Sequence, residues 1–307
     1  MRRLTKLKKL TKLTKLITPL AMAICCPAYA AITCTVSVTN INTLFDGFSA
    51  SDTIATGSYT VTCNRLAGDP LTLNWDLAAD NGTNNTGSTN RVAIGSVAPY
   101  LSYELYRSST ITGGNRWQLA NGLRFAGTAS FANTSATNYS SGPQPFTLRM
   151  PPNPVIRPAG TYTDLVSVTL RIDGSGTVLD AKTFNVQVAV AQQCKITSPI
   201  GDVSFNYQSF QATPNRPTSV IPIRCNDNLA YVVKLDGTTG TLAGLNYTLS
   251  LQSATNIQIA RNFTGTGNVI NSTIYGQIVA GASGICAAPN SSGQCVAQQQ
   301  RVVTVEW

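Results

Sequence analysis

The chain has 307 residues, a length that suits two ordinary domains, and 43% of them are hydrophobic, which excludes general disorder. Only 11% are charged and histidine is absent, so the commonest general base and the commonest metal ligand are both missing. Seven of the 22 lysines and arginines lie in the first 16 positions, and the rest of the chain carries 15 basic against 13 acidic residues. This nearly neutral body gives no reason to expect a nucleic-acid partner.

Residues 1–30 are predicted to be a secretory signal peptide. A long basic region is followed by a short apolar stretch at residues 17–24 and by Ala28-Tyr29-Ala30, a typical cleavage sequence. Because leucine and lysine recur at three- and four-residue spacing, an amphipathic membrane-surface helix is the alternative. A lipoprotein modified at Cys25 is disfavoured by the bulky Ile24 before it. No later apolar run reaches the length of about 18 residues that a membrane-spanning helix requires.

The cysteines after the signal peptide indicate how the chain is organised. Their even number in an exported protein predicts disulfides, although six cysteines allow fifteen connectivities. The first two enclose 28 residues and the next two enclose 30, which favours three pairs in sequence order. Zinc is the alternative, but neither a Cys-x-x-Cys motif nor a histidine supports it. The predicted disulfides are Cys34–Cys63, Cys194–Cys225 and Cys286–Cys295.

The two long-spaced pairs indicate an internal duplication. An aromatic-rich run follows the first cysteine of each pair, and an alternating strand, at residues 59–63 and 220–225, leads to the second. Two copies of one domain, each stapled by a disulfide near its start, are therefore predicted at residues 31–192 and 193–307.

The remainder of the sequence predicts β-structure. Apolar and polar residues alternate at 71–75, 101–106 and 247–251, and clusters of Gly, Asn, Ser and Thr such as residues 80–90 favour turns. Long helical periodicity is missing after the signal peptide. Short strands separated by turns predict an all-β fold of two immunoglobulin-like antiparallel β-sandwich domains. Residues 142–160 carry six prolines and are predicted to form an extended loop or an edge strand.

The two copies end differently. In the first, strands at residues 162–172 and 184–190 flank the turn Asp173-Gly174-Ser175-Gly176 and form a closing hairpin. In the second, residues 301–307 resemble the first strand of that hairpin, and the sequence stops there. A sandwich without its last strand leaves an apolar groove and unpaired backbone groups, which a strand from a partner chain can fill by donor-strand complementation. The predicted acceptor edge comprises Val302, Val303, Val305 and Trp307.

This organisation resembles the spore coat U domain family, the subunits of archaic (Csu-type) chaperone–usher pili. The likeness rests on the opening cysteine of the domain, on the aromatic-rich run that follows it and on its partner cysteine about 30 residues later. It rests also on Leu-Ser-Tyr-Glu-Leu-Tyr at 101–106, Ala-Gly-Thr-Tyr-Thr-Asp at 159–164 and Ile-Tyr-Gly-Gln-Ile at 274–278. The second copy departs from the family pattern, because it lacks the Gly-x-Tyr-x-Asp lead into its last strand and carries Cys286 and Cys295 there instead.

The resemblance implies a two-domain tip adhesin that is exported through the periplasm to the cell surface. Residues 31–192 would be the adhesin domain and residues 193–307 the pilin domain. The implied partners are a periplasmic chaperone, an outer-membrane usher and the next pilin subunit, which donates a strand. Only residues 31–33 precede Cys34, too few to donate a strand in turn, and this favours a place at the tip. Attachment of cells to surfaces in biofilms is the expected function, and a structural spore-coat or matrix protein is the alternative.

Catalysis is not predicted. Serine and threonine lack a histidine partner, the cysteines are expected to be paired, and Glu104 and Glu306 are the only glutamates beside eleven aspartates. Glu104 lies in an alternating strand, where an outward-facing charge is ordinary. No cofactor or metal is expected either.

The resemblance also implies a binding mechanism, in which apolar loops at the distal end of the adhesin domain contact abiotic or host surfaces. Three loops are candidates, at residues 94–99, 111–119 and 146–156. The last is attractive because prolines hold its apolar side chains in a stiff loop, although a packed crossover between strands is the alternative. A glycan site built on the aromatic side chains of Trp75, Tyr100, Tyr106 and Trp117 is a further alternative. The candidate contact residues are Val97, Pro99, Trp117, Met150, Pro152, Val155 and Ile156.

Overall fold

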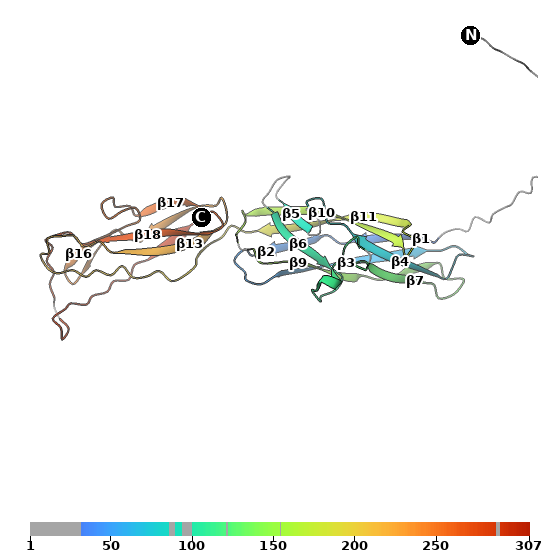
Figure 1. Cartoon of the computed structure of the whole chain (residues 1–307), viewed down its shortest axis with the longest axis horizontal. Coiled ribbons are helices and arrows are strands. Elements are labelled where there is room, and N and C mark those ends of the chain that lie inside the picture. The colour runs from blue at the N-terminus through green and yellow to red at the C-terminus, as the bar shows by residue number, and fades with distance from the viewer. Residues whose placement is uncertain (1–31, 86–89, 94–99, 121, 154, 287–288) are drawn as a thin grey trace, which may run out of the picture.

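The computed structural model describes residues 32–85, 90–93, 100–120, 122–153, 155–286 and 289–307. The predicted signal peptide and the candidate loop with Val97 and Pro99 therefore lie outside the described residues. Two β-sandwiches lie end to end (Figure 1), so the predicted all-β fold is confirmed. One hydrophobic core is built from residues between 32 and 190, and a second from residues between 194 and 305. We call the two sandwiches the first unit and the second unit.

The first unit is one curled sheet. In the described residues its elements are β1 (Thr33–Val38), β2 (Ile41–Phe45), β3 (Thr53–Asn64), β4 (Thr72–Ala79), β5 (Asn90–Ala93), β6 (Tyr100–Tyr106), the 3-10 helix η1 (Gly113–Asn115), β7 (Phe125–Ser130), β8 (Asn138–Ser140), β9 (Gln144–Met150), β10 (Gly160–Ile172) and β11 (Val178–Val190). The strand order is β1-β3-β9-β6-β5-β10-β11-β2, from which β4, β7 and β8 branch. These pairings are antiparallel except that of β2 with β11, which is parallel.

The predicted closing hairpin of the first unit is confirmed. β10 pairs with β11 over almost its whole length, with Tyr162 opposite Val188 and Val168 opposite Lys182. The connecting turn contains Gly174 with φ 74°, a left-handed conformation that other residues rarely adopt. In the second half of β11, buried side chains alternate with side chains outside the core. The first unit is therefore closed by its own last strand.

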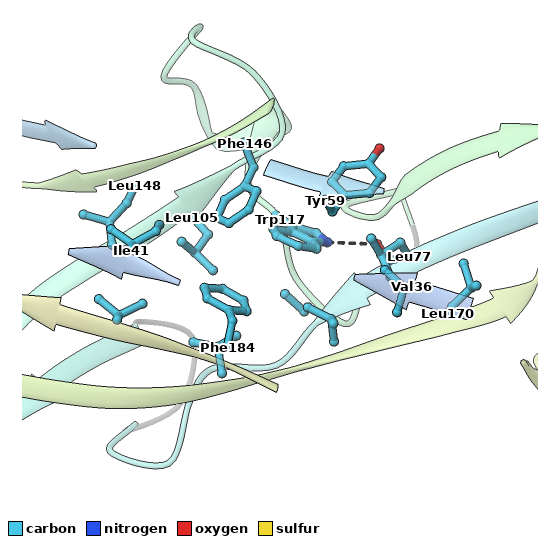
Figure 2. Close-up of a cluster of buried hydrophobic side chains, with 14 of the residues drawn as sticks. Val36, Ile41, Tyr59, Leu77, Leu105, Trp117, Phe146, Leu148, Leu170 and Phe184 are labelled. Atoms are coloured by element: carbon cyan, nitrogen blue, oxygen red, sulfur yellow. Dashed lines mark hydrogen bonds between the residues drawn. The ribbon is translucent and has the colours of Figure 1, made fainter. Parts of the chain in front are cut away.

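Aromatic side chains fill the centre of the first unit (Figure 2). Trp117 is completely buried, stacks on Phe184 with ring centroids 6.4 Å apart, and meets Phe146 edge-on at 5.0 Å. Its indole nitrogen donates a hydrogen bond of 2.8 Å to the carbonyl oxygen of Leu77 on β4. The indole therefore packs between β9 and β11 with its one polar atom satisfied.

The second unit has two separate sheets. In the described residues its strands are β12 (Cys194–Ile196), β13 (Thr218–Cys225), β14 (Ala230–Leu235), β15 (Thr239–Leu242), β16 (Leu245–Ser250), β17 (Ala260–Thr264), β18 (Val269–Gln277) and β19 (Val303–Glu306). One sheet has the order β12-β13-β18-β16-β15 and the other has the order β17-β14-β19. These pairings are all antiparallel.

Three disulfides join the cysteines that the sequence spacing predicts. Cys34 lies directly opposite Cys63 in the β1–β3 ladder, and Cys194 lies directly opposite Cys225 in the β12–β13 ladder. The two long-spaced bridges thus occupy the same place in the two units, as an internal duplication requires. The third bridge joins the remaining two cysteines in the segment between β18 and β19.

The proline-rich segment at residues 142–160 contains a central strand, so the prediction of a loop or edge strand is wrong for its middle part. β9 lies between β3 and β6 in the sheet. It pairs with β3 along its whole length but with β6 only at residues 147–149. The prolines at positions 143, 145, 151 and 152 fall outside that doubly paired section, where backbone donors are needed on both sides.

A buried carboxylate ties the loop between β4 and β5 to β10. Asp164 accepts hydrogen bonds from the Tyr103 hydroxyl at 2.7 Å and from the backbone nitrogens of Thr83 and Asn84 at 2.9 and 3.1 Å. Burial, reinforced by this carboxylate, raises the pKa of Tyr103 well above its ordinary value, so the phenol keeps the proton that it donates. A side chain at Gly82, whose φ is 75°, would overlap the carboxylate. Residues 82–84 are therefore built around this one side chain.

Tyr162, two residues before Asp164 on β10, is a second anchor of the fold. The hydroxyl of Tyr162 donates a hydrogen bond of 2.8 Å to the carbonyl oxygen of Pro158, four residues upstream. This is the tyrosine corner that immunoglobulin-like sandwiches form at the start of strand F. Burial raises the pKa of Tyr162 to about 12, which keeps the donor protonated. The sequence at residues 160–164 thus stabilises the fold.

Replacing Asp164 with alanine is expected to lower the free energy of unfolding of the first unit by about 2–3 kcal/mol, because the Tyr103 hydroxyl and two backbone N–H groups lose their partner. Asp164→Asn keeps an acceptor oxygen and is the matched control, with about half that loss. Chemical unfolding of the full chain, followed by tryptophan fluorescence, measures both values. An alanine variant as stable as the parent protein would contradict the anchoring role.

Candidate functional site

One edge of β19 is open. β19 pairs with β14, from Val303 opposite Leu235 to Glu306 opposite Val232, and none of the described residues pairs with its other edge. In the first unit the equivalent strand is β10, which has β4 on one side and β11 on the other. The second unit therefore presents backbone N–H and C=O groups where the first unit has a ladder.

The pairing register places β19 in the position of the second half of β10. Leu170 of β10 lies opposite Leu77 of β4, and Val305 of β19 lies opposite Val233 of β14. Leu170 is completely buried, whereas Val305 is only half-buried. The difference arises because β11 covers one strand while none of the described strands covers the other. Val303, two residues before Val305, is half-buried for the same reason.

Residues 203–207 form the other side of this opening. Val203, Phe205 and Tyr207 are half-buried against the second core and alternate with exposed residues, but the segment pairs with no strand in the described chain. The corresponding segment of the first unit is β2, which pairs in parallel with β11. A strand equivalent to β11 would therefore lie between β19 and residues 203–207. We call the following residues the acceptor edge: Val203, Phe205, Tyr207, Val303 and Val305.

The predicted edge residues divide into two pairs. Val303 and Val305 pack against the second core. Val302 is 61% exposed, and Trp307 is 55% exposed beside a cavity of about 690 Å³ at the end of β19. The prediction omitted residues 203–207, although their alternation of apolar and polar side chains is the signal that identifies them.

Three of the predicted contact residues are buried, so their assignment to a binding surface is wrong. Trp117 and Met150 are completely inaccessible, and Ile156 is 1% exposed. A loop position has no alternation that predicts the side on which it packs, and the bulk of these apolar side chains favours the interior. Trp75 and Tyr106 are buried as well, so of the four aromatic residues suggested for a glycan only Tyr100 is partly exposed.

The loop that contains Ile156 lies at the junction of the two units. The amide of Ile156 donates a hydrogen bond of 3.0 Å to the carbonyl oxygen of Gly267, and its own carbonyl accepts one of 3.2 Å from the amide of Asp227. The buried Asn226 donates from its side chain to the carbonyl oxygen of Arg157 at 2.8 Å. This loop therefore fastens the first unit to the second.

The two remaining contact candidates belong to the same junction. Pro152 is exposed and Val155 is half-buried. Val155 and Ile156 leave no room for a side chain at Gly267, whose φ is 71°. The burial of Met150 and Ile156 favours a packed crossover, the alternative that the sequence leaves open.

The opposite end of the first unit carries a different set of loops. β3 ends, β4 begins and β7 ends there, away from the second unit (Figure 1). Leu66, Leu71 and Val178 are exposed at this end, to 63%, 40% and 56%. The buried Arg65 supports the loops, because its guanidinium donates to three carbonyl oxygens between β7 and β8 at 3.0–3.2 Å. We call Leu66, Leu71 and Val178 the tip residues.

Charged side chains of the first unit engage one another. Glu104 forms an ion pair with Arg116 at 2.6 Å and accepts a hydrogen bond from Tyr106. Among the described residues, no group of three or more His, Cys, Asp or Glu side chains could hold a metal ion. Helices long and apolar enough to cross a membrane are absent from the described part of the chain.

Several solved structures are similar to this chain at low identity. The complex of CsuC with the tip adhesion subunit CsuE, from archaic chaperone–usher Csu pili of Acinetobacter baumannii, is 13% identical, covers 89% of this chain and 100% of that chain, and has a TM-score of 0.46. The CupB6 tip adhesin from Pseudomonas aeruginosa is 8% identical, with 82% and 89% covered and a TM-score of 0.36. CfaE, the adhesive subunit of the CFA/I fimbria of enterotoxigenic Escherichia coli, is 10% identical, with 87% and 96% covered and a TM-score of 0.32.

The sequence itself identifies the family. No curated protein sequence matches it significantly. The family model of the Spore Coat Protein U domain matches residues 21–169 and 180–259, which is more than half of the chain. The match includes the four cysteines of the long-spaced bridges and extends over both units. The chain therefore belongs to the Spore Coat Protein U domain family.

Proposed function

We propose that this chain is an adhesin of a chaperone–usher pilus and that it occupies the tip of the fibre. The observation that carries the proposal is the contrast between the units. The first is closed by its own β11, whereas the second presents an acceptor edge with half-buried Val303 and Val305. A closed unit is free to bind, and an open unit requires a strand from another chain. Membership of the Spore Coat Protein U domain family agrees with this assignment.

A donor strand with alternating apolar side chains would complete the second unit. Four such side chains would contribute about 1.5–3 kcal/mol each before the ordering cost of the strand, and ladder hydrogen bonds would satisfy the open edge of β19. A periplasmic chaperone is the first expected occupant, and the next pilin subunit replaces it as the outer-membrane usher assembles the fibre. The chain would thus pass through the periplasm to the cell surface.

The first unit would attach the cell to abiotic or host surfaces through its far end and so support biofilm formation. Leu66 and Leu71 are exposed in the connection between β3 and β4, which the buried Arg65 holds through the carbonyl oxygen of Asp69 at 2.9 Å, and Val178 is exposed at the start of β11. Contact with an apolar surface would therefore remove these side chains from water, at about 25 cal/mol per Å², without the cost of ordering a flexible loop. This location replaces the loops around Trp117 and Ile156, which are buried.

Replacing the three tip residues with serine is expected to reduce adhesion to polystyrene about tenfold or more, a factor that corresponds to about 1.4 kcal/mol. The stability of the purified protein should change by less than about 0.5 kcal/mol, because these side chains are exposed. The matched control is Leu44→Ser with Ile54→Ser, since both residues are exposed in the half of the first unit near the junction. Undiminished adhesion of the tip variant, or an equal loss in the control, would refute the assignment.

Gold labelling of intact cells with antibodies against the first unit tests the place of the protein in the fibre. We expect single particles at the ends of pili. Labelling along the length of the fibres would instead make the chain a main subunit. Labelling of a coat or matrix without fibres would support the structural alternative.

A further inference from the structure

Four large apolar side chains are exposed at the end of the second unit away from the first. Phe210 is 73% exposed, Val279 55%, Ile285 82% and Val296 76%. They lie in two neighbouring segments, and soluble domains rarely gather such side chains in water unless the surface binds another molecule. We call these four residues the base patch.

Hydrogen bonds hold the two segments of the base patch together. The amide of Phe210 donates to the carbonyl oxygen of Ala282 at 2.8 Å, and the hydroxyl of Tyr207 donates to the carbonyl oxygen of Val279 at 2.8 Å. Phe210 has a φ of 63°, a left-handed conformation that is strained for a bulky residue and that persists where the surrounding structure enforces it. The exposure of this phenylalanine is therefore a fixed feature of the fold.

The third disulfide holds the other two residues of the patch. Ile285 precedes Cys286 and Val296 follows Cys295, so the bridge keeps the two exposed side chains at adjacent places in the structure. Closing this loop reduces the number of conformations that it can adopt when nothing is bound. The cysteine pair that distinguishes the second copy from the first thus supports the patch.

The internal duplication relates the base patch to the contact between the units. The loop between β9 and β10 carries Ile156, which is buried at the junction with the following unit. β9 and β10 correspond to β18 and β19, because β9 pairs with β3 as β18 pairs with β13. The segment between β18 and β19 contains Val279, Ile285 and Val296. By this equivalence, the segment is placed to meet whatever follows the second unit.

The expected direction of a donor strand points to the same end of the second unit, the end that carries the base patch. β19 runs from Val303 to Glu306 in the direction of the junction, since its partner β14 begins close to Asp227, which bonds to Ile156. A donor antiparallel to β19, as β11 is to β10, would start near the junction and run past Val303 towards the base, because β11 continues for eight residues beyond Lys182, the partner of Val168. The body of the chain that supplies the donor would therefore emerge next to the base patch, just as β11 leads into the second unit.

We propose that the base patch binds the globular body of the pilin subunit whose segment fills the acceptor edge. This inference rests on the proposed function. The matching surface on the pilin is the loop end of a sandwich, because Ile156 meets the second unit at the loop after Cys225 and at Gly267. The pilin is thus held both at the acceptor edge and at the base patch. Its contact with the base patch has the same arrangement as the junction between the two units of this chain.

Site-specific photo-crosslinking in cells that assemble the pilus tests the proposal. Benzoylphenylalanine is placed at Ile285 or Val296 in the base patch and at Phe205 in the acceptor edge. The control positions are Val220 and Val269, which are 45% and 50% exposed on β13 and β18. Mass spectrometry of each adduct identifies the partner chain and the peptide that is attached.

We expect one and the same pilin chain at all three test positions. It should be attached through its N-terminal segment at Phe205 and through its folded body at Ile285 and Val296. The crosslinking yield at each control position should be lower by a factor of about ten or more. The double variant with Ile285→Ser and Val296→Ser should release the pilin more readily on mild heating in detergent. The control variant with Val220→Ser and Val269→Ser should retain it as the parent protein does.

The outcomes separate the two claims. An adduct at Phe205 without one at the base patch overturns the base-patch proposal and leaves the acceptor edge intact. A base-patch adduct with a chaperone, a lipid or a second copy of this chain overturns it in the same way. If Phe205 gives no pilin adduct either, the proposed function fails together with the inference that rests on it.

Discussion

Replacing Trp117 with alanine is expected to lower the free energy of unfolding of the first unit by about 3–5 kcal/mol. The indole is completely buried, packs against Phe146 and Phe184, and donates its N–H to the carbonyl oxygen of Leu77 (Figure 2). The substitution leaves a cavity at the centre of the sandwich and a buried carbonyl without its partner. Chemical unfolding of the full chain, followed by circular dichroism, measures the loss.

Trp117→Phe is the matched control for this prediction. Phenylalanine keeps most of the buried area and loses one hydrogen bond, so the expected loss is about 1–2 kcal/mol. An alanine variant that kept the parental stability and lost only adhesion would place Trp117 in the contact surface. The core of the first unit would then be wrongly assigned.

Supplying the missing strand within the same chain is expected to stabilise the second unit by about 5 kcal/mol and to raise its unfolding temperature by about 20 °C. The variant carries a copy of residues 173–191, which include the turn and β11 of the first unit, after Trp307. The copy can continue in register because Val305 occupies the position that Leu170 has in β10. In this register the copies of Asp180 and Lys182 lie opposite Val305 and Val303, and the apolar side chains of the copy from Phe184 to Val190 lie beside residues 203–207, as β11 lies beside β2. Calorimetry of the full chain measures the gain.

The control graft has serine at the four buried positions of the copied strand. These positions are the copies of Phe184, Val186, Val188 and Val190. The serine graft can form the same backbone ladder but buries little apolar surface, so we expect little gain from it. An equal gain from both grafts would show that apolar burial is not what the second unit lacks. No gain from the apolar graft would contradict the acceptor edge itself.

Local patterns in the sequence were sufficient for several parts of the fold. The alternation along β10 and β11 and the Gly-rich turn between them predict the closing hairpin, because all of these features act between near neighbours. The repeated cysteine spacing predicts the long-spaced disulfides for a different reason. Two copies of one domain place each pair at the same position, with Cys34 opposite Cys63 and Cys194 opposite Cys225.

The incorrect predictions concern residues whose surroundings are distant in sequence. Ile156 looks like an exposed loop residue until the second unit packs on it through Gly267 and Asp227, more than 60 positions away. β9 looks like an edge because of its prolines, and only its register with β3 and β6 shows that they avoid the doubly paired section. Sequence alternation alone does not give these pairings.

The candidate site was predicted in part. The likeness between residues 301–307 and the first strand of the closing hairpin points to Val303 and Val305, which lie on β19 and pack against the second core. The other side of the opening, at residues 203–207, was missed because alternation alone does not show which strand a segment faces, and this segment pairs with none of the described strands. Its role becomes visible only by comparison with β2, whose pairing with β11 is long-range and parallel.

Amide hydrogen exchange at the acceptor edge tests most directly whether the second unit lacks a strand between β19 and residues 203–207. The measurement compares the unmodified full chain with the variant that carries the copied strand. We predict rapid exchange in both segments of the unmodified chain and slowing by about a hundredfold in the variant, which corresponds to about 2.8 kcal/mol of added local stability. Exchange in β10 should be the same in both proteins. Protection of residues 203–207 and β19 in the unmodified chain equal to that of β10 would contradict the account.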